Sequence, residues 1–411
     1  MNRTPPTTIL LQNCRVVLLD RTAENSSLLI ESGRIARIID PHSNQSLKAD
    51  SVLDLDGLTL FPGFIDVHIH GATGVDAMAA SADDLRRVSE FLAQHGVTAW
   101  LPTLVPAATE QYEQAIHAIT RLIEKQESLF APSALNADGT SALPAKLARV
   151  LGVHYEGPFV NNEQCGALHR EHFRTFKDRA NLDSLPTIRQ AGAVHLMTLA
   201  PEIDGGIDLI KELRRRGWIV SIGHTRAAIE VLDEALRAGA HHMTHFMNAM
   251  PPLHHRAPGP VGWGLIQDEV TCDVIADGVH LDPLILKLIL RHKSAERVSL
   301  ISDAVAPAGL GDGEYQIWGE TIRVENGRTQ NARGSIAGSV ITMLDAVRMM
   351  LSLGVSESDV ARMASLNPAR LLGIDSDCGS IQEGKRADLV ALDREGKVRM
   401  TIIGGPSGND K

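Results

Sequence analysis

The middle of the chain alternates between short apolar runs and longer stretches of helical periodicity. Eight apolar runs have the length and Val/Ile/Leu content of strands, at 63–70, 97–104, 149–156, 194–200, 218–224, 242–248, 271–280 and 297–303. Helical patterns separate most of them, at 82–94, 110–125, 207–216, 227–238 and 283–291, with one more at 339–353. Strands that alternate with helices form a parallel sheet, and eight such units close a barrel. The pattern predicts an α/β fold, a (β/α)8 TIM-like barrel.

The two ends of the chain share a different, β-rich pattern. Residues 9–19, 27–39 and 52–60 carry apolar runs broken by Gly, Asp and Pro, and they contain no convincing helix. Residues 387–392 and 398–403 repeat this pattern around a turn. We expect one small β-sandwich domain built from 1–61 and 373–411, beside a barrel at 62–372. Two further predictions are a loop or mobile insertion at 128–147 and a hairpin after the eighth strand, at 309–333.

Residues of the metal-binding type stand at the ends of several predicted strands. A single His-x-His motif is a weak signal, but two such histidines on a strand project to the same face. The C-terminal ends of barrel strands form the face that carries active sites. The residues that would meet there are His68, His70, Glu156, His224 and His245. Their arrangement predicts a metal site.

The chemistry of these side chains limits the choice of metal. Imidazole and carboxylate ligands suit Zn²⁺, Fe²⁺, Mn²⁺ or Co²⁺, and no thiolate is offered. Two histidine pairs and one carboxylate can hold two ions about 3.5–4 Å apart, an arrangement that serves hydrolysis. One ion is the alternative. The sequence predicts a divalent metal as cofactor, one or two ions with zinc favoured, and a metallohydrolase.

Two further strand ends offer groups for proton transfer. Asp303 follows the apolar run that ends the eighth strand, where it could take a proton from water and return it to a leaving nitrogen. A helix cap or an ion pair is the alternative role. His280 could donate to a carbonyl oxygen as charge develops there. Alternatively, it orients a metal ligand from outside.

The loop after the sixth strand offers groups for binding a polar substrate. Asn248 and the backbone near Ala249 could bind polar atoms, although anchoring of the loop is an equal alternative. Arg256 lies in a loop bounded by proline and glycine, where a guanidinium can bind a phosphate or carboxylate through two hydrogen bonds. A solvated loop charge is the alternative there.

Composition excludes several other classes of protein. The 411 residues carry 40 Lys and Arg against 50 Asp and Glu, a formal net charge of −10 without a basic block. We therefore expect neither nucleic acid nor a membrane surface as a partner. No run approaches the length of a membrane span, and the start lacks the features of a secretory signal. The four cysteines have no paired spacing, which favours a reducing, cytoplasmic location.

Several short motifs, taken together, resemble the amidohydrolase superfamily, and within it the deacetylases of N-acetyl sugar phosphates. The resemblance covers most of the chain, from Pro62-Gly63-Phe64-Ile65-Asp66-Val67-His68-Ile69-His70-Gly71 to Gly384-Lys385-Arg386-Ala387-Asp388-Leu389-Val390. Between them lie Glu156-Gly157-Pro158-Phe159, Gly223-His224-Thr225, Thr244-His245, Asn248-Ala249-Met250, Asp277-Gly278-Val279-His280 and Asp303-Ala304. The resemblance implies metal-dependent deacetylation of N-acetylglucosamine 6-phosphate to glucosamine 6-phosphate and acetate.

The same resemblance implies roles for individual residues. The principal metal would be bound by Glu156, His224 and His245, and the intact His-x-His motif would add a second ion. The acid/base would be Asp303, and His280 would polarise the acetamido carbonyl. Sugar and phosphate would be contacted by Asn248, Ala249 and Arg256, with the arginine supplied to the neighbouring subunit of a homodimer. The fourth strand has no lysine to bridge two metals, which leaves Glu156 for that position.

One segment departs from the family pattern. The family shows Gly-Ala-His after the Glu-Gly-Pro motif, whereas this chain reads Gly166-Ala167-Leu168-His169, with one residue inserted before the histidine. A sugar-binding role for His169 depends on where that insertion places it. The alternatives are the galacto epimer as substrate, a cyclic amidase or N-acyl amino acid deacylase, and a non-catalytic scaffold. A scaffold would have lost ligands that are all present here.

Overall fold

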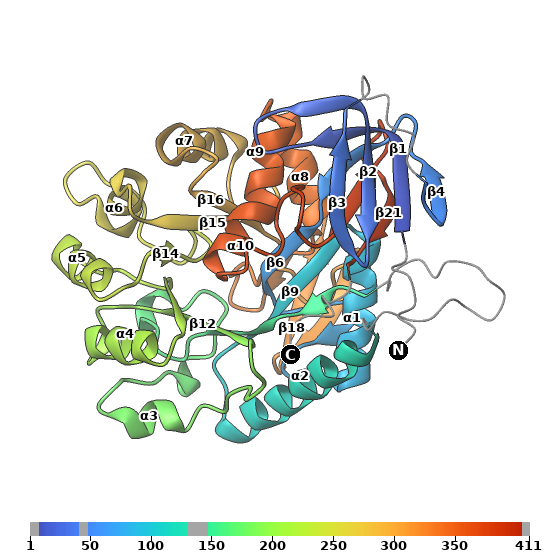
Figure 1. The fold of residues 1–411 in the computed structure, drawn as a ribbon. Coiled ribbons are helices and arrows are strands. Elements are labelled where there is room, and N and C mark those ends of the chain that lie inside the picture. Colours follow the sequence, from blue (N-terminus) through green and yellow to red (C-terminus); the bar gives the residue numbers. More distant parts are fainter. Residues whose placement is uncertain (1–7, 41–47, 130–146, 405–411) are drawn as a thin grey trace.

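A barrel and a smaller sheet built from both chain ends lie side by side (Figure 1). The structure, a computed structural model, describes residues 8–40, 48–129 and 147–404. The loop expected at 128–147 falls, from 130 to 146, outside the described residues.

The barrel consists of eight parallel strands, each hydrogen-bonded to the next in chain order. They are β6 (Phe64–Ile69), β9 (Val97–Leu104), β11 (Gly152–Glu156), β12 (Val194–Leu199), β13 (Ile219–Ile222), β14 (His242–Met243), β15 (Thr271–Ile275) and β16 (Val298–Ile301). A short strand, β10 (Arg149–Val150), precedes β11 and pairs with β9. The ring closes where Asp303 N–H donates to the carbonyl of His68 at 2.9 Å. The predicted barrel is confirmed.

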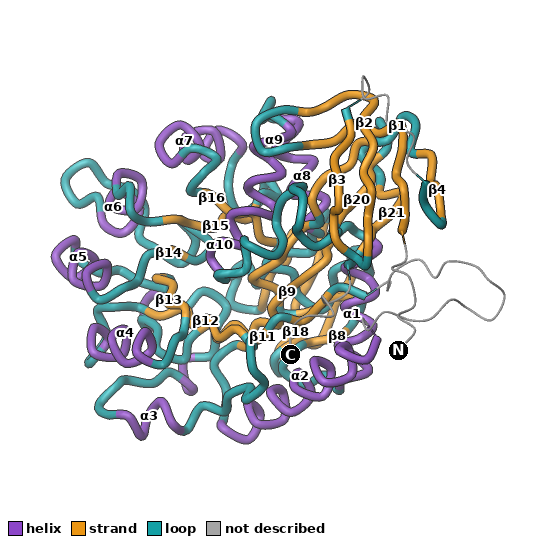
Figure 2. The backbone as a smooth tube through the Cα atoms, viewed as in Figure 1, coloured by secondary structure: helices purple, strands orange, loops and turns teal. Residues whose placement is uncertain are grey.

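Helices surround the strands (Figure 2). The α-helices are α1 (Ala82–Gln94), α2 (Thr109–Leu129), α3 (Arg179–Asp183), α4 (Gly206–Arg215), α5 (Ile229–Arg237), α6 (Gly259–Ile266), α7 (Pro283–Lys293), α8 (Met343–Ser352), α9 (Glu357–Ala361) and α10 (Asn367–Leu371). Short turns of other helix types are η1 (Asn162–Gln164), η2 (Arg170–His172) and η3 (Arg362–Leu366). Helix α1 has the predicted bounds because a capping box of Ser81 and Asp84 starts it and its apolar face is buried.

Helix α6 was not predicted, and its packing explains why. Its sequence holds three glycines and a proline, residues that disfavour helices in isolation. A Cβ on Gly262 would come within 2.4 Å of Pro258, and one on Gly264 within 2.6 Å of the Met243 sulfur. Close packing, against the start of the helix at Gly262 and against Met243 at Gly264, therefore requires glycine at both positions, and burial overrides the weak helix propensity.

The sixth and seventh strands are shorter than predicted. The prediction of a strand over 242–248 was wrong beyond Met243, and the strand expected at 271–280 ends at Ile275. After Met243 the chain turns, with φ of 32° at His245, 75° at Met247 and 50° at Ala249. An extended strand requires negative φ, so these left-handed residues end it.

Strands from both chain ends form one mixed sheet. Its members are β1 (Thr8–Val17), β2 (Thr22–Glu31), β3 (Arg34–Ile39), β4 (Ser51–Asp54), β5 (Thr59–Pro62), β20 (Leu389–Leu392) and β21 (Val398–Ile402). The broken apolar run at 52–60 forms two strands, β4 and β5, which both pair with β1 in parallel. A separate apolar core lies behind this sheet, built from residues such as Leu11, Leu28 and Leu389. The small β-domain built from both ends is confirmed.

A buried ion pair joins the small sheet to the barrel. Arg149, at the start of β10, binds the carboxylate of Asp388 and donates to the carbonyl of Gly404 at 2.9 Å. Burial opposes ionisation, but the attraction of Asp388 raises the pKa of the Arg149 guanidinium. Breaking such a buried pair by removing one partner costs about 3–5 kcal/mol, so this contact fixes the two parts together.

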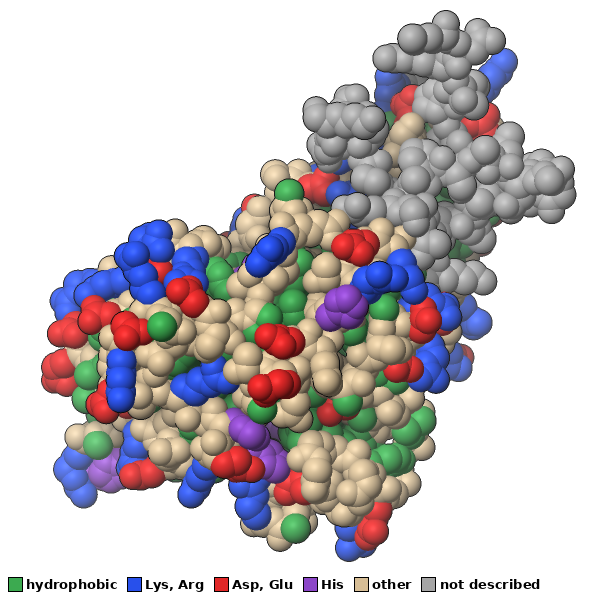
Figure 3. All heavy atoms as spheres, turned by 90° about the horizontal axis from the view of Figure 1, so that it is seen from below, with side chains coloured by type: hydrophobic (Ala, Val, Ile, Leu, Met, Phe, Trp, Pro, Cys, Tyr) green, Lys and Arg blue, Asp and Glu red, His purple; other side chains and the backbone are tan. Residues whose placement is uncertain are grey.

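Two small sheets stand at the barrel mouth. The hairpin predicted at 309–333 is a three-stranded antiparallel sheet of β17 (Gly313–Ile317), β18 (Glu320–Glu325) and β19 (Arg328–Asn331). The other is the pair β7 (Gly71–Ala72) and β8 (Val75–Asp76), directly after β6. Seen from below, the molecule carries interspersed acidic and basic side chains on the described part of that face (Figure 3).

Candidate active site

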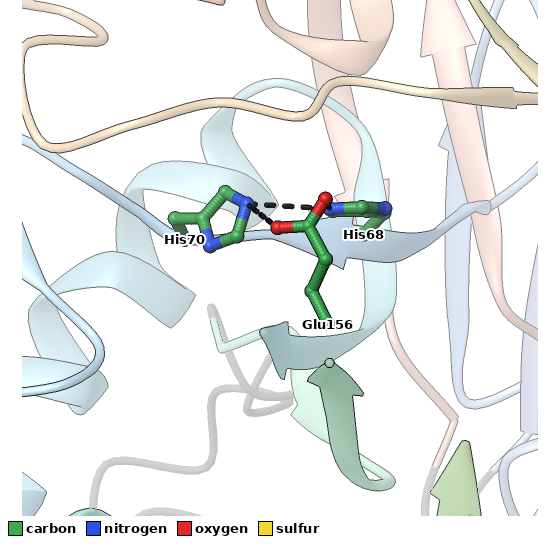
Figure 4. A group of neighbouring side chains, drawn as sticks. All are labelled: His68, His70 and Glu156. Carbon is green, nitrogen blue, oxygen red and sulfur yellow. Dashed lines mark hydrogen bonds and ion pairs between the residues drawn. The ribbon is translucent and has the colours of Figure 1, made fainter. Parts of the chain in front are cut away.

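Two groups of buried side chains at the barrel mouth share one glutamate. His68 and His70 from the end of β6 form the first group with Glu156, and His224 and His245, after β13 and β14, form the second with the same residue. Within each group the candidate ligand atoms lie within 4.8 Å of one another. Figure 4 shows the Glu156 carboxylate, from β11, between the rings of His68 and His70.

The distances within these groups are those of a ligand shell. The Nε2 atoms of His68 and His70 lie 3.2 Å apart, and those of His224 and His245 lie 3.1 Å apart. Glu156 Oε1 lies 2.9 Å from the His224 Nε2 and 3.0 Å from the His245 Nε2, while Oε2 lies 3.3 Å from that of His70. Ligands 2.0–2.1 Å from a tetrahedral ion stand about 3.3 Å from each other. The donor set therefore fits divalent cations, and Glu156 belongs to both groups.

Asp303 lies beside the first pair. Its Oδ1 lies 3.3 Å from the Nε2 of His68 and 3.2 Å from that of His70. Its side chain is 9% exposed, so little solvent reaches it. A carboxylate in this position can accept a proton at the centre of the cluster.

Three of these residues have left-handed backbone conformations. The φ angles are 47° at His224, 32° at His245 and 49° at Asp303, and each residue lies just beyond the end of its strand. Such angles cost roughly 1 kcal/mol or more in a residue with a side chain. After these turns, the His224 and His245 side chains reach Glu156, and that of Asp303 reaches the first histidine pair. Asp273 supports one turn, because its carboxylate accepts a hydrogen bond from the His245 N–H.

The two carboxylates make the pocket attract positive charge. Burial opposes ionisation of Glu156, but the charge of His68 and hydrogen bonds from His224 and His245 hold its pKa well below the usual range. Burial likewise opposes protonation of His70, yet hydrogen bonds to Asp303 and Glu156 raise its pKa to about 10. Burial also opposes protonation of His245, but the hydrogen bond to Glu156 and the charge of that carboxylate raise the His245 pKa to about 9. Either bound protons or metal cations can supply the positive charge that balances the two carboxylates.

Backbone carbonyls orient two of the histidines. His70 Nδ1 donates to the carbonyl of Thr103 at 3.2 Å, and His224 Nδ1 donates to that of Gln164 at 2.7 Å. With Nδ1 protonated, Nε2 of a neutral ring keeps its lone pair for a metal. In the part of the chain that the structure describes, the Nδ1 atoms of His68 and His245 have no hydrogen-bond partner.

His280 is held by a carboxylate. Its Nδ1 donates to Asp277 at 2.6 Å, and the same side chain accepts its backbone N–H at 2.8 Å. Burial opposes ionisation of Asp277, but hydrogen bonding to His280 lowers the pKa of this carboxyl. Within the described chain, His280 makes no hydrogen bond or ion pair with the residues of the histidine–glutamate cluster.

The candidate substrate residues lie on the loop that follows β14. Asn248 is half-buried and donates from its side-chain amide to the His245 carbonyl at 3.1 Å, while Ala249 takes a left-handed turn. Arg256 is exposed, and its guanidinium lies 2.8 Å from the Nε2 of His255. Asn248 and Ala249 therefore adjoin a candidate ligand, whereas Arg256 faces outward from this chain.

The Gly166–His169 segment lies between the cluster and the small sheet β17–β19. Leu168, the inserted residue, is 3% exposed and packs into the main core. His169 lies 3.2 Å from a carboxylate oxygen of Glu171 and 3.7 Å from one of Glu320 on β18. Arg333 ties the segment to that sheet by donating to the Ala167 carbonyl at 2.8 Å. The insertion thus gives the segment an apolar anchor and leaves the His169 ring beside two carboxylates.

Sequence reasoning missed several residues around the cluster. Trp318 packs edge-to-face on His70, with ring centroids 5.2 Å apart, and His154 does the same on His68 at 4.6 Å. Glu202 accepts hydrogen bonds from Asn161, Thr225 and the Arg226 N–H, which join three loops around His224. The sequence position of His154 and Glu202, within or next to strands that carry site residues, could have identified them. No such signal existed for Trp318, because the small sheet that carries it is far from His70 in the sequence.

Comparisons with known proteins agree with this geometry. The model of the amidohydrolase family matches residues 59–407. The N-acetylglucosamine-6-phosphate deacetylase of Bacillus subtilis is 34% identical over 406 residues, 97% of this chain and 96% of the relative. The N-acetylgalactosamine-6-phosphate deacetylase of Escherichia coli O157:H7 is 37% identical over 356 residues, 86% of this chain and 89% of the relative.

Solved structures agree as well. The N-acetylglucosamine-6-phosphate deacetylase of Thermotoga maritima has a TM-score of 0.81 at 31% identity, covering 96% of this chain and 98% of its own. A variant of the Mycobacterium smegmatis enzyme in complex with N-acetyl-D-glucosamine 6-phosphate has a TM-score of 0.83 at 30% identity, covering 98% and 99%. Among the described residues, no helix is long and apolar enough to cross a membrane.

Proposed function

This chain belongs to the amidohydrolase family, and we propose that it hydrolyses N-acetylglucosamine 6-phosphate to glucosamine 6-phosphate and acetate. The observation that carries the proposal is the meeting of two histidine pairs at Glu156, with Asp303 3.2 Å from the His70 Nε2. Structures similar over nearly the whole chain are deacetylases of this sugar phosphate.

The proposed metal ligands are His68, His70, Glu156, His224 and His245. We propose one or two divalent ions, with zinc favoured by the imidazole and carboxylate donors and iron, manganese or cobalt as alternatives. A bound ion supplies Lewis-acid polarisation and lowers the pKa of water. The residues themselves hold the ligand atoms in place: Glu156 spans both pairs, and the carbonyls behind His70 and His224 fix their rings.

Asp303 is the proposed acid/base. As water attacks the acetamide carbonyl, its carboxylate accepts the proton, and it then returns that proton to the leaving nitrogen. A lowered pKa supports this role, because burial opposes ionisation but the charge of His68 and the hydrogen bond to His70 keep Asp303 ionised. His280, which Asp277 holds through Nδ1, is the proposed donor to the carbonyl oxygen as negative charge develops there.

We propose Asn248, Ala249, Arg256 and His169 as substrate-binding residues. Arg256 binds the phosphate of the substrate in the neighbouring subunit, so the enzyme is a homodimer; its exposure on this chain supports such sharing. A cytoplasmic location fits the four buried, unpaired cysteines. His169, which lies 3.7 Å from a carboxylate oxygen of Glu320, is the proposed contact of the sugar hydroxyls.

A second candidate is the galacto epimer as substrate, favoured by one relative. The Escherichia coli deacetylase of N-acetylgalactosamine 6-phosphate is 37% identical, compared with 34% for the Bacillus subtilis enzyme named for the gluco sugar. The inserted Leu168 anchors the segment that carries His169, one of the proposed substrate-binding residues.

Acetate release tests the proposal. Metal-loaded protein is given N-acetylglucosamine 6-phosphate, its galacto epimer and unphosphorylated N-acetylglucosamine. We expect rapid release from the gluco phosphate and a loss of about 10²–10⁴-fold in kcat for Asp303→Asn, which removes the base but keeps its shape. For Arg256→Ala we expect a raised KM for the phosphorylated sugar alone, with Arg256→Lys intermediate. Faster release from the galacto epimer would select the second candidate, and no release from either phosphate would exclude both.

A further inference from the structure

His68 has an unusual position among the proposed ligands. Metal-binding histidines generally donate their second ring nitrogen to a fixed acceptor, as His70 and His224 do here. Within the described chain, His68 Nδ1 has no such partner. His245 shares this feature, but Asp273 holds its backbone N–H. The orientation of the His68 ring therefore depends on what packs against it.

The nearest packed ring is that of His154. Its centroid lies 4.6 Å from that of His68, with the planes at 76°, compared with 5.1 Å to His70 and 5.6 Å to His245. His154 is 1% exposed and lies on β11, two residues before Glu156. An edge-to-face contact at this distance favours one relative orientation of the two rings.

His154 is itself fixed from both sides. Nδ1 lies 3.0 Å from the carbonyl of Val67, which can only accept, so Nδ1 carries the proton. In the neutral ring Nε2 then accepts from the Thr198 hydroxyl at 2.8 Å. Thr198 lies 2.7 Å from the Thr244 hydroxyl, which in turn contacts that of Ser221. This chain of hydrogen bonds joins β6, β11, β12, β13 and the turn after β14, next to the cluster.

We propose that His154 is a positioning residue that sets the orientation of His68 and hence the cation affinity of the His68/His70 pair. The inference rests on the proposed function, in which that pair binds a divalent ion. The ring of His154 provides the packing surface, and its hydrogen bonds hold that ring in the barrel. A purely structural role would change the stability of the barrel without changing cation affinity.

Two variants separate these roles. His154→Ala removes both the packing surface and the hydrogen bonds. His154→Phe keeps a ring against His68 but leaves the Val67 carbonyl and the Thr198 hydroxyl without their partner. The matched control is His195→Phe, on the neighbouring strand β12, because His195 also accepts a hydrogen bond, from the Ile188 N–H at 3.0 Å, and stacks on Trp218.

Each apoprotein is prepared with a chelator, titrated with Co²⁺ by visible absorption, and unfolded in parallel to measure stability. We expect His154→Ala to bind Co²⁺ about 10–100-fold more weakly, the effect of losing an outer partner of a metal ligand. His154→Phe should be less stable but keep an affinity close to that of the wild type. His195→Phe should lose stability alone.

The outcomes separate this inference from the proposed function. A wild-type protein that takes up no Co²⁺ overturns both. Wild-type uptake with an unchanged affinity and absorption spectrum in His154→Ala overturns the inference alone, as does an equal loss of affinity in His154→Phe. If His154→Ala does not fold, His154→Leu replaces it, because leucine fills space without a ring: weaker Co²⁺ binding in the leucine variant than in His154→Phe supports the inference, and equal binding in the two contradicts it.

Discussion

The two histidine pairs reach the same glutamate by different routes. His68 and His70 come from one strand, where their spacing of two residues brings their Nε2 atoms within 3.2 Å. His224 and His245 come from two strands, and each needs a left-handed backbone turn, with φ of 47° and 32°. The first pair is thus formed by strand geometry, whereas the second requires strain that the surrounding loops must support.

The supports differ accordingly. Around the second pair they are polar: Asp273 holds the His245 N–H, and Glu202 joins the loops on either side of His224. Around the first pair they include aromatic rings, since Trp318 packs on His70 and His154 on His68. A site with two ions can therefore lose affinity at one pair without losing it equally at the other.

Replacing Glu156, which both histidine pairs share, should weaken metal binding at both pairs. In Glu156→Gln both pairs lose their common carboxylate, and we expect metal affinity to fall by more than about 100-fold, beyond the loss of an outer partner alone. Metal content after dialysis, measured by elemental analysis, checks this. Retention of one full equivalent of metal would show that one pair binds without Glu156.

Lowering the pH should weaken metal binding at both histidine pairs. His70 and His245 have pKa values raised to about 10 and about 9, so below pH 9 both carry protons that a metal must displace. Lowering the pH strengthens that competition, and affinity should fall by up to about 100-fold per pH unit for two displaced protons. Calorimetry in two buffers of different ionisation enthalpy counts these protons at pH 7.5. Release of none would contradict the prediction.

Removing the support of His245 should weaken only the second pair. Asp273→Asn keeps the shape of the side chain but loses the charge that binds the His245 N–H, and we expect about 10–100-fold weaker metal binding there. Stoichiometric titration of the apoprotein should then show one tight and one weak equivalent. Asp233→Asn, outside the site on α5, is a control that should leave both unchanged.

The aromatic support of His70 should have the smallest effect. Trp318→Ala removes an edge-to-face contact of about 0.5–1.5 kcal/mol, which corresponds to a loss of roughly 2–10-fold in metal affinity at the first pair. Trp318→Phe, which keeps a ring, should lie between this variant and the wild type. Competition with a chromophoric chelator measures both, and a larger loss at the second pair would reverse the assignment.

Much of the fold was predictable because its periodicity is local. Helix α1 has the predicted bounds, since its cap and its apolar spacing both appear in the sequence. Helix α6 was missed because its glycines are explained only by what packs against them. The end of β14 was misplaced because a left-handed turn at His245 has no local signal in a run of buried residues.

The candidate site divides in the same way. Six residues were identified because each lies at or near the end of a predicted strand, and the structure brings all of them together: His68, His70, Glu156, His224, His245 and Asp303. Arg256 and His280 make no hydrogen bond or ion pair with that cluster in the described chain, because loops set their positions. Trp318 could not be identified, since the hairpin that carries it is far from His70 in the sequence.

The sequence by itself determined the barrel, the small sheet made from both ends and the identity of the six clustered residues, because these follow from periodicity and strand ends. Only the tertiary structure decided that Asp303 lies beside the first pair and that His154 packs behind His68. These relations join strands far apart in the chain. They depend on barrel closure and left-handed turns, which no local pattern specifies.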